Sequence, residues 1–244
     1  NVSSRCQLNM CVAIDFTNHR GSHDQTSAST TKLNEYEWIM SVMDLALSSY
    51  RINVDYPVYG FGAASMNGRR QQQVHDIFQC GPSKTANGAD GLIKAYQTFF
   101  KTGLECSNYR TGYDKVIQAA AAHARTAMYE AQQHQKLAYT VLVVLTTGSA
   151  KNILDAKRTL ESVSKEPLSI VFVKMGSDDT TTWDDVKLDV QLTHNGCRSF
   201  CSFLQTSQFS NPRRDSQGFA SSAIACLEEN VPTFFLSQNV YPTI

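Results

Sequence analysis

Two groups of polar residues carry the oxygen atoms best placed to bind a ligand, because each group follows directly on an apolar segment. The apolar residues 10–14 run into Asp15 and Thr17, and a second apolar segment ends at Thr146 and Thr147. Both segments have the composition of strands buried on both faces of a parallel sheet. In such a sheet, ligands bind beyond the carboxyl ends of the strands. We therefore expect these carboxylate and hydroxyl groups to lie together at one edge of a sheet.

Helix and strand patterns alternate along the rest of the chain and form the elements that must position this edge. Apolar residues at helical spacing predict helices at about 113–135, 155–165 and 215–229, and helices that begin near Asn34 and Asp90. Buried-strand patterns predict strands at 56–61, 139–145 and 167–173 and an edge strand at 199–204. Residues 22–31 and 81–91 are predicted as surface loops. The alternation predicts an α/β fold with a doubly wound, mostly parallel sheet flanked by helices on both faces.

Length and charge limit the possible functions. The 244 residues suit a single α/β domain that spans residues 1–244 and buries a sizeable core. Lys and Arg together number 22, as do Asp and Glu, so no net field favours nucleic acid as a partner. Apolar runs stay shorter than the ~18–20 residues of a membrane span, so we expect no direct membrane insertion. Because the sequence begins at Asn1 without a methionine, we expect it to be excised from a longer protein.

The cysteines indicate a reducing environment. There are seven, an odd number, and several lie within apolar runs, as buried free thiols do. We therefore expect an intracellular, cytoplasmic protein. His194, Cys197 and Cys201 have spacings that a zinc site could use, but no Cys-x-x-Cys pair accompanies them. We interpret them as a loop histidine and two thiols that flank a strand.

The sequence gives no support for catalysis or nucleotide binding. Gly148 and Ser149 follow a predicted strand but lack the second glycine of a nucleophile elbow. The chain has no G-x-x-x-x-G-K-S/T loop for a nucleotide. Gly60 and Gly62 are too close together for a dinucleotide fingerprint, and tight packing at a strand end explains them better. We predict that this chain is not an enzyme.

Several segments, in order and at similar spacing, resemble the copine family over nearly the whole chain. They are residues 11–17 (CVAIDFT), 34–36, 57–63 (PVYGFGA), 91–96, 166–173 (EPLSIVFV), 208–209 and 228–232. The resemblance implies a von Willebrand A-type domain, which is Rossmann-like in fold and forms the C-terminal half of calcium-responsive membrane-binding proteins. Related plant RING-type ubiquitin ligases share this domain, so the resemblance does not decide which kind of full-length protein contains it.

The resemblance also implies a metal-ion-dependent adhesion site that has degenerated. The family would hold Mg²⁺ with Asp15, Thr17, a serine at position 19, a threonine matching Thr111 and an aspartate at position 147. In this chain, His19 replaces the serine, which is the second hydroxyl ligand, and Thr147 replaces the aspartate, which is the second carboxylate ligand. Mg²⁺ needs near-octahedral oxygen ligation with carboxylates, whereas a histidine nitrogen suits zinc or nickel better. We predict no metal cofactor; if Mg²⁺ were retained, Asp15, Thr17 and Thr111 would hold it.

These observations favour a non-catalytic module that binds a protein partner at the edge of the sheet. The predicted surface comprises Asp15, Thr17, Asn18, His19, Thr111, Thr147 and Ser149. One alternative is a metal-dependent adhesion-type domain with altered ligation. Another is the substrate-recognition domain of a RING-type ubiquitin ligase or part of a calcium-dependent phospholipid-binding protein. In that case flanking domains could bind membrane, and other parts of the protein could associate it with membrane or cytoskeleton.

Overall fold

A mostly parallel sheet forms the centre of the computed structural model, which describes residues 6–17, 33–48, 50, 54–66, 72–107, 112–147, 153–176, 200–209 and 216–240. Its strands run in the order β10 (Cys201–Gln205), β9 (Leu168–Lys174), β8 (Leu137–Thr146), β1 (Cys6–Asp15), β2 (Asp55–Phe61) and β5 (Phe78–Gln79). All neighbours from β10 to β2 pair in parallel, whereas β5 and the short β6 (Thr85–Asn87) pair with β2 antiparallel.

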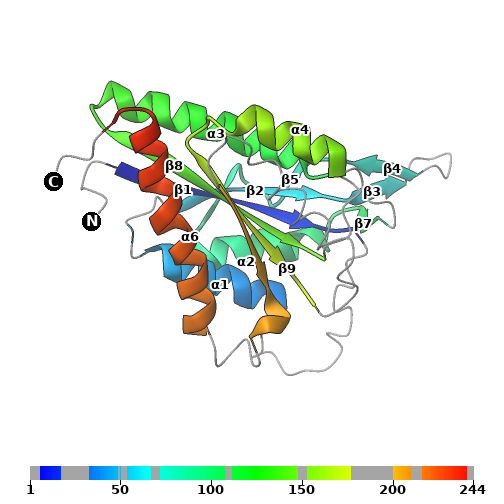
Figure 1. Cartoon of the computed structure of the whole chain (residues 1–244). Coiled ribbons are helices and arrows are strands. Elements are labelled where there is room, and N and C mark those ends of the chain that lie inside the picture. Colours follow the sequence, from blue (N-terminus) through cyan, green and yellow to red (C-terminus); the bar gives the residue numbers. More distant parts are fainter. Residues whose placement is uncertain are drawn as a thin grey trace.

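Helices cover both faces of this sheet (Figure 1). One face carries α1 (Glu35–Ser48), α2 (Gly88–Phe99) and α6 (Ser216–Ser237), and the other carries α3 (Asp114–Gln133) and α4 (Ile153–Val163). A single turn of 3₁₀ helix, η1 (Thr206–Gln208), follows β10. This arrangement confirms the predicted α/β class with a doubly wound, mostly parallel sheet.

Side chains of the central strands alternate between two apolar cores. On β1, Met10, Val12 and Ile14 pack with residues of α1, α2 and α6, whereas Cys11 and Ala13 pack with residues of α3 and α4. A strand with cores on both faces has no polar side, which explains the nearly continuous apolar segments. The two cores fix the sheet rigidly up to the carboxyl ends of β1 and β8.

The first helix begins where the sequence predicts, because Asn34 and Glu37 form a capping box. The Glu37 amide donates to the Asn34 side-chain oxygen at 2.9 Å, and the Asn34 amide donates to a Glu37 carboxylate oxygen at 2.9 Å. This exchange satisfies two backbone donors that the helix itself leaves free. The apolar positions of α1 then face the core, with Ile39 and Leu47 fully buried.

Three features differ from the prediction. Helix α6 continues beyond Glu229, through Pro232, to Ser237, because packing of Phe234 and Phe235 outweighs the hydrogen bond that proline cannot donate. Residues 81–91, predicted as a loop, contain β6 and the start of α2. A second, antiparallel sheet of β4 (Gln72–His75), β3 (Ala63–Met66) and β7 (Leu104–Cys106) was not predicted, because its strands are too short to show a pattern.

Other expectations hold or lie beyond the described residues. Strand β10 is an edge strand, as predicted. Cys11 and Cys80 are buried free thiols, and Cys6, Cys106 and Cys226 are half-buried free thiols. Within the described residues, every helix is too short or too polar to cross a bilayer. The loop at 22–31 falls outside the part of the chain that the structure describes.

Candidate functional site

Asp15 lies at the carboxyl end of β1 with hydrogen bonds to both of its carboxylate oxygens. The Thr17 amide donates to Oδ1 at 2.8 Å, and the Thr146 hydroxyl donates to Oδ2 at 2.7 Å. The Tyr113 hydroxyl lies 2.9 Å from Thr146 Oγ1. Because the Thr146 proton points to Asp15, the Tyr113 hydroxyl is the donor in this second contact. Protein groups therefore already satisfy the carboxylate.

Burial sets the protonation behaviour of this carboxylate. Asp15 is 2% exposed. Burial raises the pKa of Asp15 to about 6, while hydrogen bonds from Thr146 and Thr17 act in the opposite direction. Removing a carboxylate from water disfavours its charged form unless opposite charge or donors compensate. The site thus holds its single described acid in an environment where hydroxyl and amide donors do the compensating.

The strand register explains why these residues meet. Ile14 pairs with Leu145, so the next residues, Asp15 and Thr146, end neighbouring strands. Thr146 in turn pairs with Lys174 at the end of β9. Lys174 is 0% exposed, which is rare for lysine. Phe172, two residues earlier, packs in the α3 core, so alternation places Lys174 on the face where Tyr113 meets Thr146.

Gly62 allows the chain to pass close to this site. Its φ is +71°, and an added Cβ would lie 2.2 Å from Thr17 Oγ1 and 3.0 Å from Asp15 Oδ1. A Cβ on Gly60 would lie 2.2 Å from the ring of Phe78. These contacts confirm that tight packing at a strand end explains the two glycines. Only a residue without a side chain fits between β2 and the Asp15 turn.

The structure describes three of the seven predicted site residues. Asp15 and Thr17 lie together, and Thr147 follows Thr146 directly at the end of β8. The Thr147 hydroxyl is buried and has no hydrogen-bond partner among the described residues. The predicted site residues Asn18, His19, Thr111 and Ser149 fall outside the described residues, as do His194 and Cys197.

Sequence reasoning missed two side chains and undervalued a third. It placed Thr146 at a strand end but not in the site, although Thr146 is the residue that binds Asp15. Tyr113 and Lys174 were not singled out at all. Tyr113 and Lys174 come close to Thr146 through the position of α3 and the register between β8 and β9. The sequence contains one signal for them, which is that Lys174 is a charged residue at the end of a predicted strand. The unexpected lysine at that end was the available clue.

Among the residues that the structure describes, the predicted metal positions offer few of the ligands that Mg²⁺ needs. They offer one carboxylate, whose two oxygens already accept hydrogen bonds, together with neutral hydroxyls. Over the described parts of the chain, there is no group of three or more His, Cys, Asp or Glu side chains that could hold a metal ion. A hard divalent cation needs several oxygen ligands, with carboxylates to offset its charge. What this arrangement can do is present a rigid, hydrogen-bonded edge of the sheet.

Comparison with known proteins identifies the family. The chain is 27% identical over 261 residues to Protein BONZAI 2 of Arabidopsis thaliana, covering 99% of this chain and 42% of that protein. It is 26% identical over 241 residues to Copine-A of Dictyostelium discoideum, covering 95% of this chain and 38% of that protein. Among solved structures, it is similar to proximal thread matrix protein 1 from the mussel byssus, with 14% identity and a TM-score of 0.46 over 90% of this chain and 46% of that one.

The chain therefore spans less than half the length of these two curated relatives. The family model described as Copine matches residues 26–242, which is most of the sequence. That match extends across α1, β2, α2 and β9, which carry four of the resembling segments, whereas the segment at residues 11–17 on β1 lies before it. Both the matched range and the named relatives agree with the motif segments in the sequence, and the chain belongs to the copine family.

Proposed function

We propose that this chain is a non-catalytic protein-interaction module of a copine-type protein. Its partner docks at the carboxyl-end edge of the sheet and does so without Mg²⁺. The docking surface is centred on Asp15, Thr17 and Thr147, whose polar groups are buried at the strand ends, and includes Asn18, His19, Thr111 and Ser149, which the sequence assigns to the same edge. We use the name docking edge for this set.

One observation carries the proposal: the hydrogen bonds that occupy both oxygens of Asp15. In an adhesion-type site of this family, a bound cation would bridge the domain to a carboxylate of the partner. Here Thr17 and Thr146 donate, at 2.8 and 2.7 Å, to Asp15, the only acid at the carboxyl end of a described parallel strand. With a donor set that does not suit Mg²⁺, the energy of docking must come from direct contacts. Such contacts concentrate in a few buried anchor residues.

Capture of partner proteins from a cell lysate, measured by quantitative mass spectrometry in the presence of a chelator, tests this function. The variant Asn18→Arg/Ser149→Arg places bulk and charge on the docking edge. We expect it to reduce capture at least ~10-fold, which corresponds to ~1.4 kcal/mol. Capture by the unmodified chain should be the same in chelator and in millimolar Mg²⁺.

A matched control separates the docking edge from the outer helices. Glu161→Arg on α4 and Glu229→Arg on α6 also introduce two arginines, at exposed positions away from the edge. This control should capture partners as the unmodified chain does. Capture that survives the edge variant but is lost in the control would overturn the proposal and place binding on the outer helices. Capture that requires Mg²⁺ would favour the alternative, an adhesion-type site with altered ligation.

The parent protein decides the cellular setting of this module. The chain spans less than half the length of these relatives, and we propose that it is one domain of a longer protein whose other parts supply further activities. We propose an intracellular protein, on the basis of the free thiols among the described cysteines. Flanking C2 domains would bring the module to membranes, and a flanking RING domain would make it a substrate-recognition unit for ubiquitin transfer.

A further inference from the structure

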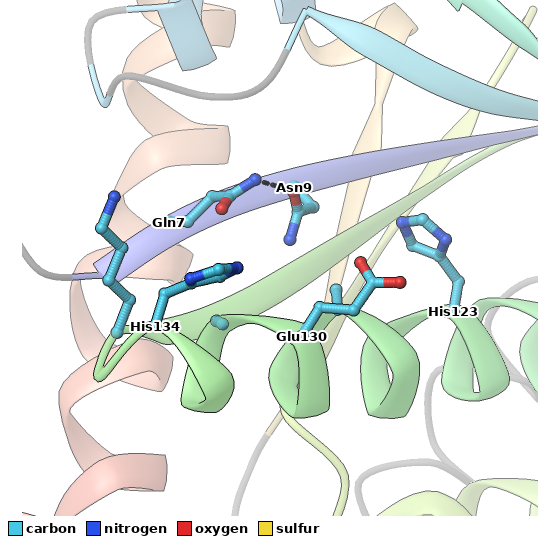
Figure 2. Close-up of a pocket in the computed structure, with 8 residues that line it drawn as sticks. Gln7, Asn9, His123, Glu130 and His134 are labelled. Atoms are coloured by element: carbon cyan, nitrogen blue, oxygen red, sulfur yellow. Dashed lines mark hydrogen bonds between the residues drawn. The ribbon is translucent and has the colours of Figure 1, made fainter.

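A polar pocket of about 380 Å³ lies at the opposite end of β1 from the docking edge (Figure 2). It is lined by Gln7 and Asn9 of β1, by His123, Ala127, Glu130 and Ala131 of α3, and by His134 and Lys136 beyond the helix. Asn9 precedes Asp15 by six residues, roughly 20 Å at the ~3.3 Å rise of a strand. The pocket is therefore separate from the site described above.

The fold creates this pocket where apolar packing under α3 stops. Cys11 and Ala13 fill the core beneath the helix, and strand alternation directs Asn9 to the same side. Opposite it, α3 presents the small side chains of Ala127 and Ala131, four residues apart on one helix face. Polar strand residues that meet alanines leave a space that no side chain fills.

Asn9 has an amide nitrogen without a partner at the base of this pocket. The residue is 5% exposed. Gln7 Nε2 donates to Asn9 Oδ1 at 3.1 Å, whereas Asn9 Nδ2 is buried and makes no hydrogen bond. Figure 2 shows this nitrogen pointing into the space between His134 and Glu130. A buried, unsatisfied donor destabilises the folded state, so binding of an acceptor group at the base of the pocket would be favourable.

A second unsatisfied group lies beside Asn9. Thr140 of β8 is its partner in the strand register and is 0% exposed. Leu142, two residues later, packs in the α3 core, so Thr140 also faces α3. The Thr140 hydroxyl has no hydrogen-bond partner either. Thr140 lies behind the pocket and Asn9 lines it, so the unsatisfied Asn9 amide is the group that favours a polar ligand.

The charges around the pocket select the ligand class. Lys136 and Glu130 supply one positive and one negative charge. Burial lowers the pKa of His123, with Glu130 acting in the opposite direction, so the imidazole is mostly uncharged at neutral pH. A simple anion would meet Glu130, and a simple cation would meet Lys136. A ligand that carries both charges suits both residues.

We propose that this pocket binds a small zwitterion of the α-amino acid class. Its carboxylate accepts a hydrogen bond from Asn9 Nδ2 and pairs with Lys136, and its ammonium group pairs with Glu130. The volume of about 380 Å³ lies at the lower end of the range for small-molecule sites, which suits a single amino acid. The binding is independent of the docking edge and of any metal there.

Isothermal titration calorimetry of the 244-residue chain against each proteinogenic L-amino acid, at up to about 10 mM, tests the proposal. We expect at least one to bind with a Kd at or below the millimolar range. Acetate and methylamine, which each carry only one of the two charges, should bind at least tenfold more weakly. If acetate binds as tightly as the amino acid, the ligand is a simple anion and the proposed class is wrong.

Variants assign the binding to this pocket. Asn9→Leu removes the unsatisfied donor at similar volume, so it should weaken binding at least tenfold while the melting temperature stays equal or rises. Glu130→Gln should also weaken binding at least tenfold, whereas Glu161→Gln on α4 should leave it unchanged. No amino acid binding to the unmodified chain, or binding that both pocket variants retain, would overturn the proposal.

Discussion

Asp15 shows how groups of the protein can donate hydrogen bonds to both oxygens of a buried carboxylate. The Thr17 amide and the Thr146 hydroxyl donate to its two oxygens, and Tyr113 donates to Thr146. This chain of hydrogen bonds supplies the partners that a buried carboxylate needs. The neighbouring Thr147 hydroxyl stays buried and unpartnered within the described part of the chain. Because position 147 holds threonine rather than aspartate, it adds a hydroxyl group and not a second carboxylate to this edge.

Gly62→Ala should destabilise the fold by about 2 kcal/mol or more, measured by chemical denaturation. Alanine pays about 1–2 kcal/mol for a left-handed backbone, and its Cβ would lie 2.2 Å from Thr17 Oγ1. Gly103→Ala is the matched control, because a Cβ there would meet nothing within 4 Å. Similar free energies of unfolding for the two variants would show that Gly62 is not constrained by the Asp15 turn.

The sequence predicted the site residues that directly follow strands. It did not predict the residues that other elements of the fold bring to the site. Asp15 and Thr17 could be found because a buried strand must end in a polar turn at the ligand-binding edge. Tyr113 could not, because its contact with Thr146 depends on where α3 lies over the sheet. Lys174 depends on the register between β8 and β9, which no local pattern reveals.

At the scale of elements, local sequence signals predict a helix boundary correctly where no tertiary packing opposes them. They fail where packing extends the helix. Asn34 predicted the start of α1 because a cap is a short-range device, and the structure shows the full capping box with Glu37. The end of α6 was placed too early, since Pro232 normally limits a helix. The helix persists because Phe234 and Phe235 pack on Tyr139 of β8, with ring centroids 5.5 and 6.1 Å away.

Phe235→Ala should therefore cost about 3–5 kcal/mol, as loss of a buried aromatic ring usually does. The ring is 4% exposed, whereas the next residue, Leu236, is 51% exposed. Leu236→Ala removes an apolar side chain from the same turn and should change the free energy of unfolding by less than about 1 kcal/mol. Urea unfolding of both variants measures the difference. Equal effects would mean that the last turns of α6 are not docked on the sheet.

At the scale of the whole molecule, β1 connects two ends of one rigid sheet. Its carboxyl end carries Asp15, and its amino-terminal half carries Asn9. Seven strands and two apolar cores hold these ends apart, so each can change without the other. Because the strands are complete up to these ends, the proposed loss of metal ligands at one end need not alter the backbone there.

Restoring the family ligands should make the stability of the whole domain depend on Mg²⁺. The unmodified chain should melt at the same temperature in chelator and in millimolar Mg²⁺. His19→Ser/Thr147→Asp should melt higher in Mg²⁺, because a ligand at 100 times its Kd stabilises the folded state by about 2.7 kcal/mol. For a domain of this size that corresponds to a rise of about 5–10 °C, measured by scanning calorimetry.

Adding Asp15→Ala to the restored variant is the control and should remove the rise, since it deletes the first carboxylate. Two results would contradict this account. A rise in the unmodified chain that Asp15→Ala abolishes would mean that the site still binds Mg²⁺ with the ligands it has. A restored variant that folds but melts identically with and without Mg²⁺ would mean that the turns after β1 and β8 have diverged in backbone as well as in ligands. Comparing these results therefore distinguishes a change in the ligand side chains alone from a change in the backbone of the turns.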